Sequence, residues 1–106
     1  MSLATSSVEP EILTPSTYTV MTNVTGAIPH VRINTYDVNY EQAITEVILQ
    51  RESDTPVSYK VANGDFTVQN SNIALFVHGT YSITGKYIWT IKATGYTDAT
   101  VSVDVN

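Results

Sequence analysis

The side chains that could act as a general base near neutral pH are the two histidines, His30 and His78. An enzyme built on either would also need a nucleophile within hydrogen-bond reach and a preorganised pocket. His30 follows Pro29 at the start of an alternating run, and His78 precedes Gly79 where another run ends. Both positions are typical of histidines that face solvent at turns. We therefore expect no catalytic residues and no enzyme activity.

Ligands for a haem or a metal ion are sparse. An imidazole or a phenol can ligate haem iron, and the chain has seven tyrosines, but no part of the sequence marks the apolar slot that haem requires. Asp37 with Asn39, or Asp98, could give oxygens to calcium, but these residues also favour turns, and no dense acidic loop is present. There is no cysteine, and two separated histidines are too few for a structural zinc site. We expect neither a cofactor nor a metal.

Three tyrosines form the candidate partner-binding surface: Tyr36, Tyr40 and Tyr59. Tyrosine rings are amphipathic, so an exposed cluster of them could stack on sugar rings or anchor a protein partner. Trp89 has a different expected role, because it alternates with Tyr87 along one strand face. A tryptophan in such a position packs between two sheets. We expect Trp89 in the core.

Charge and composition exclude two classes of function. The net charge is −5, with five Lys and Arg against ten Asp and Glu, and such a surface repels the phosphate backbone of nucleic acids. No apolar run approaches the ~18 residues that a membrane span needs, so we expect no membrane insertion.

The β-branched residues Thr, Val and Ile dominate over Leu, which favours pleated sheet over helix.

The clearest structural pattern is a closing pair of strands between Gly85 and Val105. Apolar and polar residues alternate with a period of two in each strand, and the turn at 94–98 contains Gly95, which can adopt a positive φ. Further short runs bounded by turn residues span 18–21, 30–36, 57–61, 66–68, 73–77 and 80–84. Asn63-Gly64 predicts a type I′ hairpin between the third and fourth of these runs. The pattern predicts an all-β fold, an Ig-like or fibronectin-III-like two-sheet β-sandwich of seven to eight strands.

The segment 39–51 fits both a helix and a strand. Asn39 and Gln42 have the spacing of a reciprocal helix cap, while the β-branched run that ends at Arg51 is typical of a strand. We predict one helical turn over Tyr40–Ala43 and then a strand over Thr45–Arg51, since a longer helix has no natural place in a sandwich.

Two stretches resemble a known family. Residues Gly85–Ala99, GKYIWTIKATGYTDA, are similar to the pattern G-x-Y-x-I-x-I-K-A-x-G-Y-x-D-A that ends the Shr-like hemoglobin-interacting domain, with Trp89 at the first Ile of the pattern. Upstream, Tyr40–Val47 resembles W-x-x-A-I-T-x-V, with Tyr40 in place of Trp. The resemblance covers about residues 26–105. It implies an Ig-like repeat of a Gram-positive surface protein, and it names hemoglobin as a partner to consider.

The domain is expected at 12–106, after a linker or a tail left by expression at 1–11. The first functional hypothesis is a non-catalytic module of a bacterial cell-surface or secreted protein, acting as a structural spacer or as a protein-interaction or adhesion repeat. Its partners would be neighbouring domains of an exported protein, and possible host proteins include hemoglobin. The alternatives are a ligand-binding module for hemoglobin, haem or a glycan, and an accessory domain of a secreted multidomain enzyme.

Overall fold

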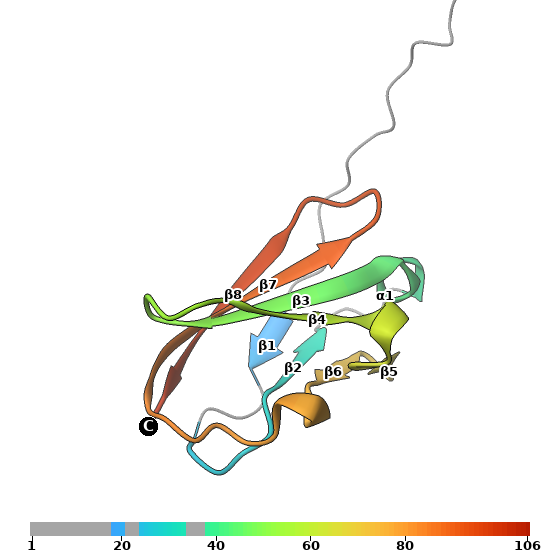
Figure 1. Cartoon of the computed structure of the whole chain (residues 1–106). Coiled ribbons are helices and arrows are strands. Elements are labelled where there is room, and N and C mark those ends of the chain that lie inside the picture. Colours follow the sequence, from blue (N-terminus) through green and yellow to red (C-terminus); the bar gives the residue numbers. More distant parts are fainter. Residues whose placement is uncertain (1–17, 21–23, 34–37) are drawn as a thin grey trace, which may run out of the picture.

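The computed structural model describes residues 18–20, 24–33 and 38–106, which form two antiparallel sheets packed face to face (Figure 1). The first sheet has the strand order β1-β2-β6-β5, and the second has the order β4-β3-β7-β8. In chain order the elements are β1 (Tyr18–Val20), β2 (His30–Ile33), α1 (Val38–Ala43), β3 (Ile44–Arg51), β4 (Val57–Lys60), the 3₁₀ turn η1 (Val61–Asn63), β5 (Val68–Gln69), β6 (Asn72–Ala74), the 3₁₀ turn η2 (Phe76–His78), β7 (Gly85–Ala93) and β8 (Ala99–Val105). The predicted all-β sandwich is confirmed, with eight strands in the described part of the chain.

The closing strands β7 and β8 form as their alternation predicts. Trp89 lies opposite Val101, and Tyr87 lies opposite Val103. Tyr87 and Trp89 are buried between the sheets, because side chains two residues apart share one face of a strand. The indole Nε1 of Trp89 donates a hydrogen bond of 3.2 Å to the hydroxyl of Tyr81, so its polar atom is satisfied inside the core. The expected burial of Trp89 is confirmed.

The segment 39–51 divides into a short helix and a strand, as expected. The helix α1 ends at Ala43, and β3 starts directly at Ile44, one residue earlier than predicted. β3 is the central strand that pairs with both β7 and β4, and its residue Val47 lies opposite Ile91 on one side and Tyr59 on the other. Because both neighbours of Val47 are buried, the inner face of this sheet is continuous core.

The hairpin predicted at Asn63-Gly64 is wrong. Val61–Asn63 instead forms η1, and Gly64 caps it with a φ of +74° and an amide that donates to the carbonyl of Val61 at 2.9 Å. The chain then crosses from β4 in the second sheet to β5 in the first, so β4 and β5 are not partners (Figure 1). The two-residue hairpin lies further on, at Asn70-Ser71, where φ angles of +51° and +66° match a type I′ turn.

Two further predicted runs are interrupted. The run at 73–77 is strand only to Ala74, because the chain then turns into η2. The run at 80–84 is not a strand: Tyr81 points into the core while Ile83 is exposed. Its backbone is held by the loop before β2, since the amide of Tyr81 donates to the carbonyl of Ala27 at 2.9 Å. These turns place residues 76–84 along one end of the sandwich.

Candidate protein-interaction surface

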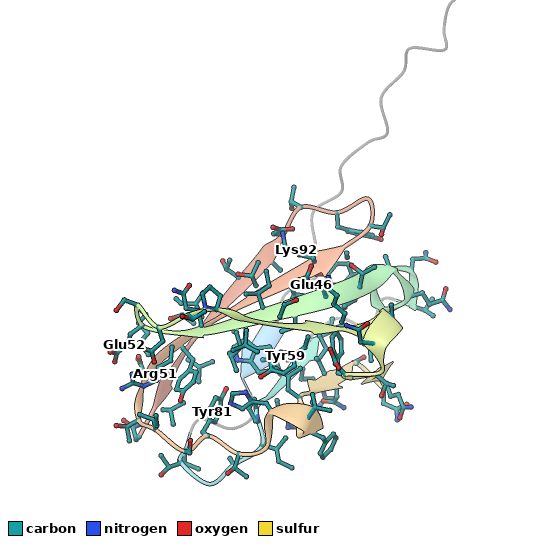
Figure 2. The ribbon with its side chains drawn as sticks, viewed as in Figure 1. Glu46, Arg51, Glu52, Tyr59, Tyr81 and Lys92 are labelled. Carbon is teal, nitrogen blue, oxygen red and sulfur yellow. The ribbon has the colours of Figure 1, made fainter. Side chains whose placement is uncertain are left out.

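The three tyrosines expected at the surface do not form a binding surface in the described structure. Tyr40 is fully buried, and its ring packs edge-on against Tyr96 with centroids 4.7 Å apart. Tyr59 is only 7% exposed, because it lies on the inner face of β4 (Figure 2). Tyr36 lies outside the described residues. The prediction of an exposed tyrosine cluster is therefore wrong for Tyr40 and Tyr59, whose rings fill the core.

The histidine at the end of η2 joins the two sheets. His78 is half-buried, and its Nδ1 forms a hydrogen bond of 2.5 Å with the hydroxyl of Tyr59. Burial lowers the pKa of His78. Burial also raises the pKa of Tyr59, and the nearby Asp65 carboxylate adds to this shift. The expectation that His78 is an ordinary solvent-facing turn residue is wrong.

The directions of the two pKa shifts indicate which protonation states the Tyr59–His78 pair favours. A histidine that activates a phenol as a base needs a stable imidazolium and a stable phenolate. Here both shifts favour the neutral forms. The hydrogen bond between these two neutral groups joins η2 to β4.

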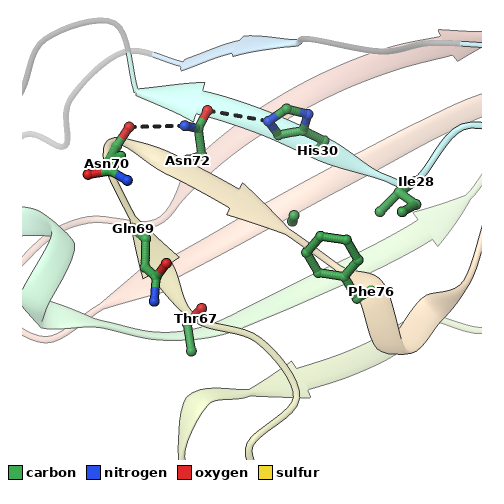
Figure 3. Close-up of a pocket in the computed structure, with 8 residues that line it drawn as sticks. Ile28, His30, Thr67, Gln69, Asn70, Asn72 and Phe76 are labelled. Atoms are coloured by element: carbon green, nitrogen blue, oxygen red, sulfur yellow. Dashed lines mark hydrogen bonds between the residues drawn. The ribbon is translucent and has the colours of Figure 1, made fainter.

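A hollow lies on the outer face of the first sheet, across β2, β6 and β5 (Figure 3). It has a volume of about 370 Å³ and is lined by Ile28, His30, Thr67, Gln69, Asn70, Asn72, Ala74 and Phe76. Strand alternation explains the lining, because Asn72 and Ala74 point outward while Ile73 between them is buried. Phe76 and Ile28 lie at one end of the hollow, and Asn70 and Gln69 lie at the other (Figure 3).

The polar wall of the hollow is held in place by its own hydrogen bonds. His30 Nε2 donates to Asn72 Oδ1 at 3.3 Å, and Asn72 Nδ2 donates to the carbonyl of Asn70 at 3.0 Å. His30 starts β2, as its place in the run 30–36 predicts, but it is half-buried rather than solvent-facing. These contacts fix the orientation of the Asn72 amide, since its oxygen can only accept and its nitrogen can only donate.

The apolar end of the hollow carries the most exposed large hydrophobic side chain of the described residues. Phe76 is 70% exposed, and its neighbour Val77 is 59% exposed. Sequence reasoning missed this pair because it placed both residues in a strand. Five consecutive apolar residues, 73–77, precede His78 without any alternation, and that lack of alternation was the available signal.

Charges are distributed unequally over the two sheets. None of the residues that line the hollow is Asp, Glu, Lys or Arg, although the exposed Arg32 lies beside it on the same face of β2. The second sheet and its turns carry the ion pairs Arg51–Asp54, at 3.2 Å, and Lys92–Asp98, at 2.8 Å. The outer face of the first sheet is thus the less acidic face.

The described residues do not fit a haem or metal site. No three His, Asp or Glu side chains converge in the part of the chain that the structure describes. The hollow is open and walled by amides, whereas haem needs a deep apolar slot. Within the same residues, no helix is long and apolar enough to cross a membrane.

Comparison with known proteins gives one match. A family model described as "Heme-binding protein Shr-like, Hb-interacting domain" matches residues 13–106. The match covers the whole described sandwich, and it confirms the resemblance seen at residues 85–99. Neither the curated proteins nor the solved structures gave a match.

Proposed function

This chain belongs to the Hb-interacting domain family of Shr-like heme-binding proteins. We propose that it is a non-catalytic module that binds the intact hemoglobin protein rather than free haem. The observation that carries the proposal is the family match over residues 13–106, which spans both sheets. The exposed Phe76 and Val77 support it, because aromatic side chains are enriched in the buried centres of protein interfaces.

The absence of catalysis is part of this proposal. His78 is engaged with Tyr59 in a pair whose pKa shifts favour neutral groups, and His30 donates to Asn72. Among the described residues, the side-chain hydrogen bonds of His30 and His78 go to Asn72 and Tyr59, and neither goes to a serine or threonine hydroxyl. A binding module needs no such pair, because its function comes from surface shape and desolvation.

We further propose that the module works in a larger bacterial surface or secreted protein, where neighbouring domains flank it. Hemoglobin is a host protein, so a domain that binds it must be exposed outside the cell. Labelling intact cells with an antibody to this domain tests the location. Labelling only after lysis would contradict it.

The binding proposal is tested with the isolated chain. Hemoglobin is immobilised on a biosensor and titrated with the domain, with myoglobin and serum albumin as control surfaces. We expect saturable binding to hemoglobin at micromolar or lower concentration and no binding to albumin. In a parallel titration, free hemin should give no Soret shift with the domain.

Two results would contradict the binding proposal. No saturable binding to hemoglobin would leave the spacer role, in which only neighbouring domains are partners. Sub-micromolar binding of hemin with a Soret shift would indicate a ligand-binding module for haem instead.

A further inference from the structure

We infer that hemoglobin docks on the outer face of the first sheet, with Phe76 as its apolar anchor. This inference rests on the proposed function. The docking surface, called the Phe76 surface below, comprises the hollow together with the exposed Val77, which follows Phe76 in the chain. Its apolar part is Ile28, Ala74, Phe76 and Val77, and its uncharged polar part includes Thr67, Gln69 and Asn72.

The Phe76 surface combines a hollow with strongly exposed apolar side chains. A lone exposed hydrophobic side chain is ordinary, but here Phe76 lines a hollow, and Val77, which follows it in the chain, is exposed as well. Other exposed hydrophobic side chains, such as Val57 at 46%, do not line it. A partner side chain that enters the hollow would contact the Phe76 ring and the wall of Asn72 at once (Figure 3).

The turn that presents Phe76 is fixed at both ends. On one side Leu75 is fully buried, and its amide donates to the carbonyl of Pro29 at 2.9 Å. On the other side His78 is tied to Tyr59 of the opposite sheet at 2.5 Å. Because the backbone of Phe76 is already ordered, docking on its ring loses little conformational entropy. A preorganised aromatic ring of this kind is suited to anchor a protein interface.

The Phe76 surface lacks formal charges in its hollow, and this suits a protein partner that binds by burying apolar and uncharged polar area. A charge buried at an interface costs desolvation energy unless it is paired, and the lining of the hollow carries no formal charge. The second sheet carries charged side chains such as Glu46 and Lys92, which an interface there would have to desolvate. Hemoglobin binding through the Phe76 surface should therefore depend weakly on ionic strength, with Arg32 at its border as the nearest charge.

Two pairs of variants test the surface. Phe76→Ala removes the anchor, and Val57→Thr is its control, because Val57 is also exposed but lies on β4 of the other sheet. Thr67→Lys places a charge in the hollow, and Thr100→Lys places the same charge on the exposed side of β8. We expect hemoglobin affinity to fall by about tenfold or more for each hollow variant and by less than about twofold for each control.

The outcomes separate the surface from the function. If the wild-type chain does not bind hemoglobin, the proposed function fails. If it binds and all four variants bind equally well, the function stands and the Phe76 surface is wrong. Thermal melting checks folding, and the Thr67→Lys result stands independently if Phe76→Ala unfolds.

Two other occupants would also overturn the inference. Amide side chains beside an aromatic ring can bind a sugar, so a glycan array is probed with wild type and with Phe76→Ala. Glycan binding that is lost in the variant, with hemoglobin binding retained, would reassign the surface to a glycan. A wild-type dimer in light scattering that becomes a monomer in Phe76→Ala, again with hemoglobin binding retained, would reassign it to a second copy of the chain.

Discussion

Truncation of Trp89 to alanine should remove a large part of the stability of this domain. The indole is fully buried at the centre of β7, and its Nε1 is the donor to the Tyr81 hydroxyl at 3.2 Å. Loss of a buried Trp side chain costs about 3–5 kcal/mol, from lost transfer free energy and from the cavity that remains. Domains of this size have a total stability of about 5–15 kcal/mol. We therefore expect Trp89→Ala to lower the Tm by about 15–30 °C.

The companion variant Trp89→Phe tests the hydrogen bond with a smaller loss of volume than Trp89→Ala. It keeps an aromatic ring but removes the donor to Tyr81, so its expected cost is about 1–2 kcal/mol. Combining it with Tyr81→Phe in a double-mutant cycle should show a coupling of about 1 kcal/mol. Unfolding is followed by far-UV circular dichroism in urea, because the variants lack the indole that fluorescence would report. A loss below about 1 kcal/mol for Trp89→Ala would refute the argument that this ring is the central packing element.

Three further predictions concern pH, cofactors and one turn. Because burial lowers the pKa of His78, the unfolded chain binds its proton more readily, and the stability held by neutral His78 is present above about pH 6.5 and lost as the pH falls. The difference in unfolding free energy between wild type and His78→Gln should therefore shrink from about pH 7.5 to about pH 5, and a constant difference would contradict this. Chelator, added calcium or hemin should leave the Tm unchanged, and a rise of many degrees in differential scanning calorimetry would show a specific site. Gly64→Ala should cost about 1 kcal/mol in urea unfolding, since the residue has a φ of +74° and free space around its Cα, while Gly64→Asn should cost less.

The strands that the sequence predicted best are those in which apolar and polar residues alternate regularly along the chain. β7 and β8 alternate over their full length, so their faces and the burial of Trp89 followed directly. The Asn63-Gly64 hairpin failed because both a hairpin and a capped 3₁₀ turn need a glycine with positive φ. The choice between them depends on which sheet the next strand joins, and that is a tertiary property.

The candidate site was harder to predict. Whether a side chain is exposed depends on which sheet or loop covers its face of the strand, and the sequence does not show this. Tyr40 and Tyr59 are amphipathic, and nothing in their neighbourhood along the chain distinguishes a ring in the core from one at the surface. Phe76 differs from the expectation in the other direction, because phenylalanine is usually buried and this one is exposed. Its exposure follows from the η2 turn, which directs Leu75 inward and leaves Phe76 outside. The hollow joins residues of three strands that only the fold brings together.

The pairing of β3 with β7 has a consequence for how fast the domain forms. Val47 lies opposite Ile91, yet residues 52–84, which include all of β5 and β6, separate the two strands in the sequence. The central contacts of the second sheet can therefore form only after a long loop has closed, and loop closure costs entropy before these contacts compensate for it. Refolding in stopped-flow experiments should accordingly take milliseconds to seconds, as in other sandwiches dominated by non-local pairing. During that time the apolar inner faces of β3 and β7 are open to other chains, so the domain is most exposed to aggregation while these two strands have yet to meet.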